Sequence, residues 1–329
     1  MIERLVVDNF KSIQHADVSL HRINLLIGPN NSGKSNFLSI FSSIKNRISS
    51  TSDFTGFTER NKENKLPSLN IHLNKQEITI QNGEMVFPEV TTTNFFRVYH
   101  QFIYDLRNSH IYKIQIDSLK REKIFDIKAN QINGSGENMA SFLQIVLNKH
   151  RTIFKKITED LVQFNNEFEE IVLDFLENNK IKVGLKNKEN TVFWSDELSE
   201  GVLYFLCILC IVNQPEPPKY LFIEEPETGI HPRRIKEVID LIKELAEEKD
   251  IQVFMTTHSP LVVDLFEDEP ECIHIFEMLN GITEIKNLKF DVLDPIYKEL
   301  EESGIKPQKE YYKSLGQQWI NGFLGGVPV

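Results

Sequence analysis

The sequence predicts an α/β protein in which helices alternate with the strands of a mainly parallel, wrapped sheet. Three observations lead to this fold class. Short apolar runs typical of buried strands alternate with segments of helical periodicity, a glycine-rich loop joins one such run to an amphipathic stretch, and later apolar runs end in polar residues. With 329 residues, the chain is long enough for one or two domains.

The glycine-rich loop carries the strongest signal. Residues Gly28–Ser35 read Gly-Pro-Asn-Asn-Ser-Gly-Lys-Ser and follow the apolar run 23–27. This is the spacing of a P-loop, in which glycines let backbone N–H groups curl around phosphate oxygens. Lys34 would place a positive charge beside the β- and γ-phosphates, and the Ser35 hydroxyl would reach Mg²⁺. The motif predicts that the chain binds ATP or GTP, the alternative being a chance turn.

The other elements follow from periodicity and turn residues. In the first part of the chain we expect a polar connection over 49–65 and a hairpin break at Asn82–Gly83. The strands expected there are Ile2–Val7, Ala16–Leu20, Ile23–Ile27 and short runs within Leu69–Phe87. Further on we expect amphipathic helices over Met139–Phe175, strands at Ile181–Trp194, Tyr220–Ile223, Ile251–Thr256 and Ile273–Phe276, and helices at Val202–Val212 and Ile235–Ala246.

Composition excludes several functional classes. The formal net charge of −11 rules out a global basic face for nucleic acid, so any DNA contact would be local. No apolar run is long enough for a membrane span, and the N-terminus does not resemble a signal peptide. Three cysteines suggest no disulfide framework. We therefore expect a cytoplasmic protein without a membrane partner, in which Cys207 and Cys210 are packed as small apolar residues rather than as a zinc or redox pair.

Acidic and histidine side chains follow two apolar strands. Glu224 and Glu225 end the strand 220–223, where one carboxylate could hold Mg²⁺ together with Ser35 and the other could orient an attacking water. His258 follows the next strand and could donate a hydrogen bond to a γ-phosphate oxygen. Taken alone it would be an ordinary strand-end histidine, but its place after the acidic strand favours the phosphate contact.

A third feature precedes the buried helix. Ser199, Glu200 and Gly201 could bind a γ-phosphate presented by a second subunit, through a hydroxyl and the N–H groups of a helix N-terminus. Taken alone, this string is an ordinary helix cap.

Together these strings resemble the soluble ABC-type ATPases of the RecF, SMC and OLD (overcoming lysogenization defect) group, and above all bacterial OLD-like or RecF-like proteins of the AAA family. The resemblance covers most of residues 1–260. The matching strings are Ile2–Ser12 (opening strand and a segment near the adenine), Gly28–Ser35 (Walker A), Leu198–Gly201 (a shortened signature), Ile223–Pro232 (Walker B and D-loop) and His258 (switch histidine).

The resemblance implies a P-loop NTPase of ABC type with a mixed sheet and an inserted helical subdomain. We expect an ATPase lobe with Walker A over 1–134, the helical insertion over 135–180, a second ATPase part over 181–294, and a C-terminal helix and tail over 295–329. Two strings depart from the family pattern. Glu224 stands where many relatives have aspartate, and Gln115 is only a guess at the Q-loop glutamine.

It also implies a magnesium-dependent ATPase whose site is completed by a second copy in a homodimer or higher oligomer. Catalytic roles fall to Glu225, His258 and Lys34, and the metal would be held by Ser35 and Glu224. Nucleotide contacts would come from Lys11, Asn30, Asn31, Ser32, Gly33, Lys34, Ser35 and Asn36, with Ser199, Glu200 and Gly201 reaching the nucleotide of the partner copy.

What the ATPase drives is open at this point. We expect a DNA-linked or anti-phage defence protein that acts with a separately encoded effector, for example a nuclease. The reason is that no nuclease-like acidic cluster is found after residue 260. Basic spots at 120–123 and 149–156 could touch DNA or could be solvated helix faces. The alternatives are the nucleotide-binding subunit of a membrane transporter and a slow ATP-dependent scaffold. The C-terminal stretch 311–329 is either a packed final helix or a docking tail.

Overall fold

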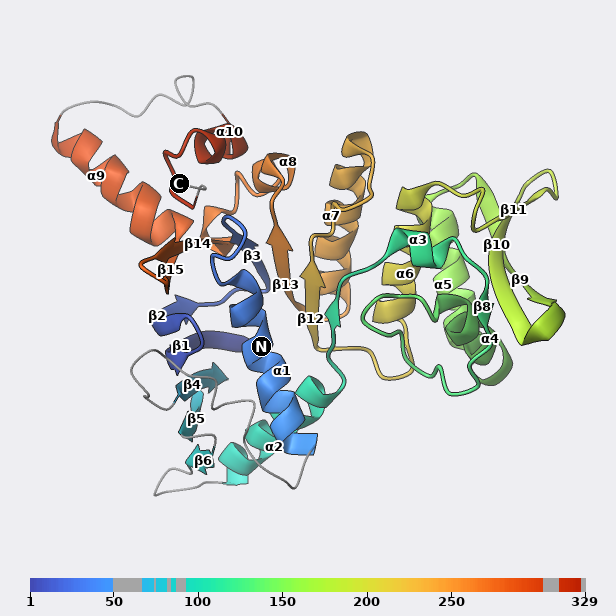
Figure 1. Ribbon diagram of the computed structural model, residues 1–329, viewed down its shortest axis with the longest axis horizontal. Coiled ribbons are helices and arrows are strands. Elements are labelled where there is room, and N and C mark those ends of the chain that lie inside the picture. The colour runs from blue at the N-terminus through green and yellow to red at the C-terminus, as the bar shows by residue number, and fades with distance from the viewer. Residues whose placement is uncertain (50–66, 74, 82–83, 87–92, 304–313, 327–329) are drawn as a thin grey trace. The chain divides into compact units, whose positions relative to one another are not determined.

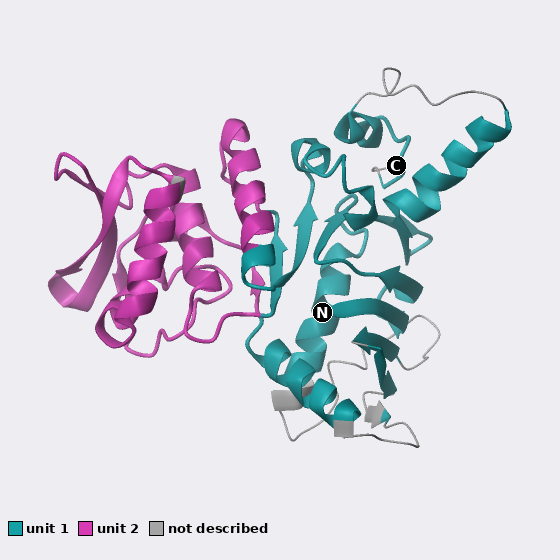
Figure 2. Cartoon of the chain, turned by 180° about the vertical axis from the view of Figure 1, so that it is seen from behind, with its two compact units in different colours: residues 1–109, 219–225, 246–329 teal, residues 110–218, 226–245 magenta. Residues whose placement is uncertain are grey.

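The computed structural model describes residues 1–49, 67–73, 75–81, 84–86, 93–303 and 314–326. The chain forms two compact units, coloured separately in Figure 2. Unit 1 contains residues 1–109, 219–225 and 246–329, and unit 2 contains residues 110–218 and 226–245.

Unit 1 is built on a mixed sheet with the strand order β6-β5-β4-β1-β2-β15-β14-β3-β13-β12 (Figure 1). β12, β13, β3 and β14 are parallel neighbours, whereas β1, β2, β4, β5 and β6 pair in antiparallel fashion, as do β14 and β15. The strands are β1 (Ile2–Phe10), β2 (Ile13–Ser19), β3 (Ile23–Ile27), β4 (Ser68–Leu73), β5 (Gln76–Gln81), β6 (Glu84–Val86), β12 (Tyr220–Glu224), β13 (Gln252–Thr257), β14 (Ile273–Leu279) and β15 (Ile282–Asn287).

This arrangement corrects one expectation and confirms another. A mainly parallel sheet is wrong for the N-terminal strands, because a connection as short as Lys11–Ser12 can join only antiparallel neighbours. The mixed sheet implied by the family resemblance is confirmed.

Aromatic packing holds the first helix of unit 1 on the central strands. The Phe41 ring lies 4.8 Å from that of Phe222 and 5.2 Å from that of Phe254, and Phe37 lies 5.6 Å from Phe276, between ring centroids. Because this helix follows β3 in the chain, it begins at the carboxyl ends of the parallel strands, where ligands bind in open α/β sheets. The helices of unit 1 are α1 (Lys34–Ser49), α2 (Thr93–Arg107), α8 (Pro260–Asp264), η2 (Pro270–Cys272), η3 (Leu288–Leu293), α9 (Asp294–Glu302) and α10 (Leu315–Ile320).

Unit 2 surrounds α6 (Glu200–Val212), in which every residue after Glu200 is buried. Its small sheet has β10 (Lys180–Asn187) paired with β8 (Lys123–Ile124), β9 (Phe168–Leu176) and β11 (Val192–Trp194). The other elements are β7 (Ile111–Tyr112), α3 (Ile116–Leu119), α4 (Met139–Lys149), α5 (Arg151–Phe164), η1 (Glu177–Asn179) and α7 (Pro232–Glu248), the last of which ends in unit 1.

Most strongly periodic segments are confirmed, and one is wrong. Helices were expected to continue to Phe175, but Phe168–Leu176 is β9, which pairs with β10 along its length. Phe168 and Ile171 are three residues apart, a spacing that imitates a helix, and only the hairpin partner reveals the strand. Residues 50–65 of the expected polar connection, and the turn Asn82–Gly83, lie outside the described residues.

In the described part of the chain, no helix combines the length and the apolar character needed to cross a membrane.

Candidate functional site

The P-loop requires glycine at both of its ends. Gly28 follows β3 with a φ of 146°, and a Cβ atom there would lie 2.3 Å from the carbonyl oxygen of Phe276. Gly33 has a φ of 106°, and its Cβ would lie 2.2 Å from Oγ1 of Thr283. Backbone sterics and close neighbours therefore both exclude a side chain at these positions.

A chain of hydrogen bonds fixes the loop to the rest of unit 1. Oγ1 of Thr283 donates to the carbonyl oxygen of Ser32 at 3.0 Å and lies 2.8 Å from Oγ of Ser12. Nδ2 of Asn36 donates to that Ser12 hydroxyl at 2.7 Å. The P-loop, the turn after β1 and the strand β15 are thus one connected polar network.

The side chain of Lys34 turns back into the loop. Its Nζ donates to the carbonyl oxygens of Gly28 and Pro29 at 2.7 and 2.8 Å, and only 6% of the residue is exposed. Burial lowers the pKa of Lys34 to about 8, although the carboxylates of Glu225 and Glu224 act in the opposite direction. Both acids are therefore close enough to influence the ammonium group.

The polar side chains of the loop differ in their exposure to solvent. Asn30, Asn31 and Ser35 are exposed, and Asn31 adopts a φ of 63°. Ser32 is fully buried, and its Oγ has no hydrogen-bond partner among the residues that the structure describes. A buried hydroxyl without a partner is costly, and a phosphate oxygen would satisfy it.

Glu225 occupies a constrained position directly after β12. Its φ is 50°, a left-handed conformation that is uncommon for a residue with a side chain, and its N–H donates to the carbonyl oxygen of Thr256 at 3.0 Å. Its Oε1 lies 3.7 Å from Nε2 of His258, which follows β13. The carboxylate and the imidazole are about one-third exposed.

The proposed metal ligands lie at two element ends. Glu224 is half-buried as the last residue of β12, and Ser35 is exposed in the first turn of α1. Within the described ranges no cluster of three or more histidine, cysteine, aspartate or glutamate residues could hold a metal ion. One carboxylate and one hydroxyl fit Mg²⁺, which usually keeps several waters and binds substrate phosphates.

The expected signature residues start the buried helix of unit 2. Ser199 is the N-cap of α6, and its Oγ accepts a hydrogen bond from the N–H of Val202 at 3.4 Å. Glu200 pairs with Lys120 at 2.8 Å, and a Cβ at Gly201 would lie 3.2 Å from Cδ of Arg234. Ser199–Gly201 and Gln115 belong to unit 2, whereas the P-loop, Glu224, Glu225 and His258 belong to unit 1.

The structure also describes the other singled-out residues. Lys11 lies in the turn after β1 with a φ of 51°, and its Nζ is 5.7 Å from the centroid of the Phe10 ring. Cys207 and Cys210 are fully buried, and burial raises the pKa of the Cys207 thiol to about 12, which is the opposite of what a redox or zinc-binding thiol requires.

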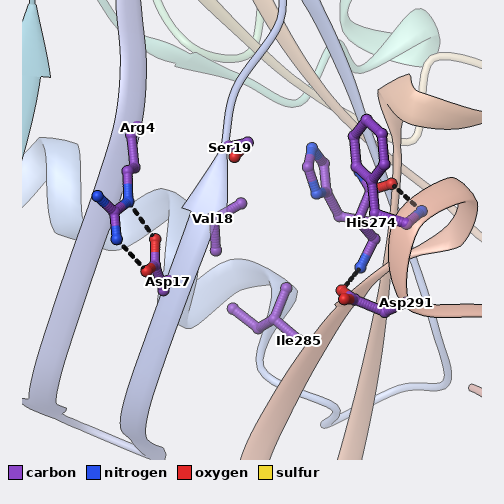
Figure 3. A pocket seen from close by; sticks show the side chains of 9 residues that line it. Arg4, Asp17, Val18, Ser19, His274, Ile285 and Asp291 are labelled. Carbon is purple, nitrogen blue, oxygen red and sulfur yellow. Dashed lines mark hydrogen bonds and ion pairs between the residues drawn. The ribbon is translucent and has the colours of Figure 1, made fainter.

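A pocket of about 510 Å³ is lined by residues of β1, β2, β14, β15 and η3 (Figure 3). Arg4 and Asp17 form an ion pair on one side, and Asp291 accepts from the backbone N–H of Asn287 at 2.7 Å on the other. Burial lowers the pKa of His274, which also lines the pocket, to about 3, so that its ring is neutral.

Residues 23–264, more than half of the chain, match the family model described as "AAA domain, putative AbiEii toxin, Type IV TA system". The chain belongs to this AAA-domain family. Solved structures with a similar fold include an SMC head bound to the C-winged helix domain of ScpA (TM-score 0.53, 16% identity, 87% of this chain and 96% of that one). Another is an SMC head with an extended coiled coil bound to the C-terminal domain of ScpA, derived from Pyrococcus furiosus (TM-score 0.54, 13% identity, 92% and 99%). The fold of this AAA-domain chain is therefore that of the SMC head domains.

Two archaeal relatives of the AAA-domain chain are named "Putative ABC transporter ATP-binding protein". The protein from Pyrococcus abyssi is 27% identical over 128 residues, which are 36% of this chain and 48% of the relative. The protein from Pyrococcus horikoshii is 36% identical over 83 residues, or 25% of this chain and 30% of the relative. The chain thus spans less than half the length of these relatives.

Proposed function

We propose that the chain hydrolyses ATP with Mg²⁺ in a site that two copies share. Lys34 would neutralise phosphate charge, Glu225 would polarise the attacking water, and His258 would contact the γ-phosphate. The observation that carries this proposal is the approach of Glu225 to His258 at 3.7 Å, on the same unit as the P-loop and within electrostatic reach of Lys34.

The residues of the loop fit the two groups that the reaction needs. The buried Ser32 hydroxyl and the Lys34 ammonium suit phosphate oxygens, and Ser35 with Glu224 would hold the metal ion. Bound Mg²⁺ would supply charge neutralisation at the β- and γ-phosphates. Lys11, Asn30, Asn31 and Asn36 would make the remaining contacts with the nucleotide.

The second half of the site would come from another copy. Ser199 presents a hydroxyl and the N-terminus of α6, and anions bind readily at such helix ends. In this arrangement the nucleotide is held between the P-loop of one copy and the Ser199–Gly201 string of the other, so dimerisation depends on ATP.

The substitution Glu225→Gln tests the assignment of the base. It preserves the shape of the side chain and removes its charge, so we expect ATP to bind, turnover to fall by about 10²- to 10³-fold, and an ATP-bound dimer to accumulate on size-exclusion chromatography. Glu267→Gln, on an exposed loop of the same unit, is the matched control and should behave like the parent. Hydrolysis by Glu225→Gln at the parental rate would show that the base is another residue.

The biological role that we propose is an ATPase of a defence or toxin–antitoxin system that acts with a separately encoded effector, a nuclease being one such partner. The family description, which names a type IV toxin–antitoxin system, supports this role. A direct DNA contact has weaker support, because Lys120, Lys123, Lys155 and Lys156 are all engaged in ion pairs with acidic side chains. Measuring ATPase activity with and without double-stranded DNA, at low and at physiological salt, tests it.

The names of the archaeal relatives favour a second candidate, the nucleotide-binding subunit of a membrane transporter. The two candidates differ in the membrane partner. Purified chain that dimerises on ATP and turns it over in detergent-free buffer supports the first, whereas dimerisation only in the presence of a membrane partner supports the second. A slow scaffold would show a single turnover without a steady state.

A further inference from the structure

The C-terminal helix α10 is fixed on unit 1 close to the P-loop. The N–H of Gly316 donates to Oδ1 of Asp264 at 2.7 Å, and a Cβ at this glycine would lie 2.3 Å from the carbonyl oxygen of Pro260. Trp319 is buried, and its indole N–H donates to the carbonyl oxygen of Gly326 at 3.0 Å. This helix therefore packs directly on the short helix that follows His258.

The residues after α10 are anchored to the strand that touches the P-loop. Gly325 and Gly326 have φ values of 77° and 66°, and the N–H of Gly326 donates to Oε1 of Glu277 at 2.7 Å. Glu277 follows Phe276, whose carbonyl oxygen limits the space at Gly28. Residues 314–326 are thus positioned beside the first residues of the P-loop.

A pocket of about 530 Å³ separates the two segments. On one side it is lined by the start of the P-loop and the strand end that carries the switch histidine, and on the other by the C-terminal segment. The lining residues are Gly28, Pro29, Asn30, His258 and Pro260 on the first side, and Trp319, Ile320, Asn321, Gly322 and Gly326 on the second.

Asn321, an exposed residue that also lines a neighbouring pocket, brings a side-chain amide donor to the C-terminal wall of this one. The backbone N–H groups of Asn321 and Gly322 already donate to the carbonyl oxygens of Gln317 and Trp319, and the indole of Trp319 is engaged with Gly326. The amide oxygen of Asn321 accepts from Nε2 of Gln317 at 3.3 Å. Its Nδ2 has no hydrogen-bond partner within the described residues, so its two donor hydrogens are available to solvent or to a phosphate oxygen.

We infer that the amide of Asn321 is a further nucleotide-binding group, which donates to the terminal phosphate of ATP bound at the P-loop of the same chain. This inference rests on the proposed function, in which His258 and the start of the P-loop face that phosphate. ADP lacks the terminal phosphate, so Asn321 contributes to the selection of ATP over ADP.

The test compares nucleotide affinities of the full chain and two variants on one helix. Asn321→Ala should bind the non-hydrolysable analogue AMP-PNP roughly tenfold more weakly than the parent and ADP with unchanged affinity, since a hydrogen bond to a charged group is lost. Asn321→Asp should be weaker still for AMP-PNP, because it places a negative charge beside the phosphate. Gln318→Ala changes a neighbouring amide that lines the adjoining pocket, which Asn321 also lines, but not the pocket beside the P-loop, and it should match the parent for both nucleotides.

Fluorescence provides a second reading of the same contact. Trp194 and Trp319 are the two tryptophans of the chain, so Trp319 is the single reporter in a Trp194→Phe background. Its emission should respond to AMP-PNP more than to ADP, and Asn321→Ala should remove the difference.

Equal loss of AMP-PNP and ADP affinity in Asn321→Ala, or no loss of either, would overturn the inference while leaving the proposed function intact. Failure of the parent chain to bind either nucleotide would contradict the proposed function, and this inference with it.

Discussion

Nε2 of His258 lies 3.7 Å from Oε1 of Glu225 because the two residues follow neighbouring parallel strands, β13 and β12. Parallel strands end at the same edge of a sheet, which brings an acid and an imidazole together from positions 33 residues apart in sequence. The left-handed backbone of Glu225 and its N–H bond to Thr256 hold the carboxylate at this edge.

We expect His258→Ala to reduce the rate of hydrolysis far more than the affinity for ATP. Loss of a hydrogen bond that strengthens as charge develops on the γ-phosphate should lower kcat by about 10²- to 10³-fold. His15→Ala is the control, because His15 is an exposed residue of β2 that pairs with Asp8 at 2.7 Å, outside the candidate site. A kcat equal to that of the control would remove His258 from the site.

The affinity for nucleotide should fall as the pH rises past 8. The pKa of Lys34 in the folded chain is about 8, below its ordinary value, so the ammonium is charged below pH 8 and loses its proton above it. Between pH 7 and pH 9 the charged fraction drops about tenfold, and AMP-PNP affinity measured by titration should drop in proportion.

The variant Lys34→Gln serves as the reference for this pH effect. It lacks the ammonium group of Lys34, so it should bind weakly at pH 7 and show no comparable decline towards pH 9. A parallel decline in both proteins would assign the titration to another group.

The network around Thr283 should stabilise both the fold and the P-loop. Thr283→Val keeps the shape but leaves the Ser12 hydroxyl and the Ser32 carbonyl without this partner, so the free energy of unfolding should fall by about 1–3 kcal/mol. AMP-PNP should also bind more weakly. Thr283→Ser keeps the hydroxyl and should retain nucleotide affinity; chemical denaturation and nucleotide titration of both variants check this, and equal behaviour of the two would contradict it.

The parts of the site that are contiguous in sequence could be predicted from it. The P-loop string, the acids after β12 and the histidine after β13 are local patterns whose chemistry requires particular residues in a fixed order. The strands that carry them, β3, β13 and β12, were also predictable, because short apolar runs that end in polar residues are typical of buried strands.

Contacts between distant segments could not be predicted. Ser12 and Thr283 are 271 residues apart, and no local pattern marks a threonine that supports a loop so far away in the chain. The same is true of Asn321, whose place beside the P-loop depends on how α10 packs on α8. The strand β9 was missed for a related reason, since its hairpin partner and not its own periodicity determines its structure.

The central claim, a site completed by a second copy, is tested most directly by mixing two inactive variants. Lys34→Ala cannot bind the phosphates but has an intact Ser199 string. Ser199→Asp still caps α6, now with a carboxylate that repels the γ-phosphate presented by a partner. In an equimolar mixture, half of the dimers pair one variant with the other and contain one complete site, so the account predicts recovery of about a quarter of the parental rate of phosphate release. An inactive mixture that nevertheless forms mixed dimers, or full activity of Ser199→Asp alone, would contradict it.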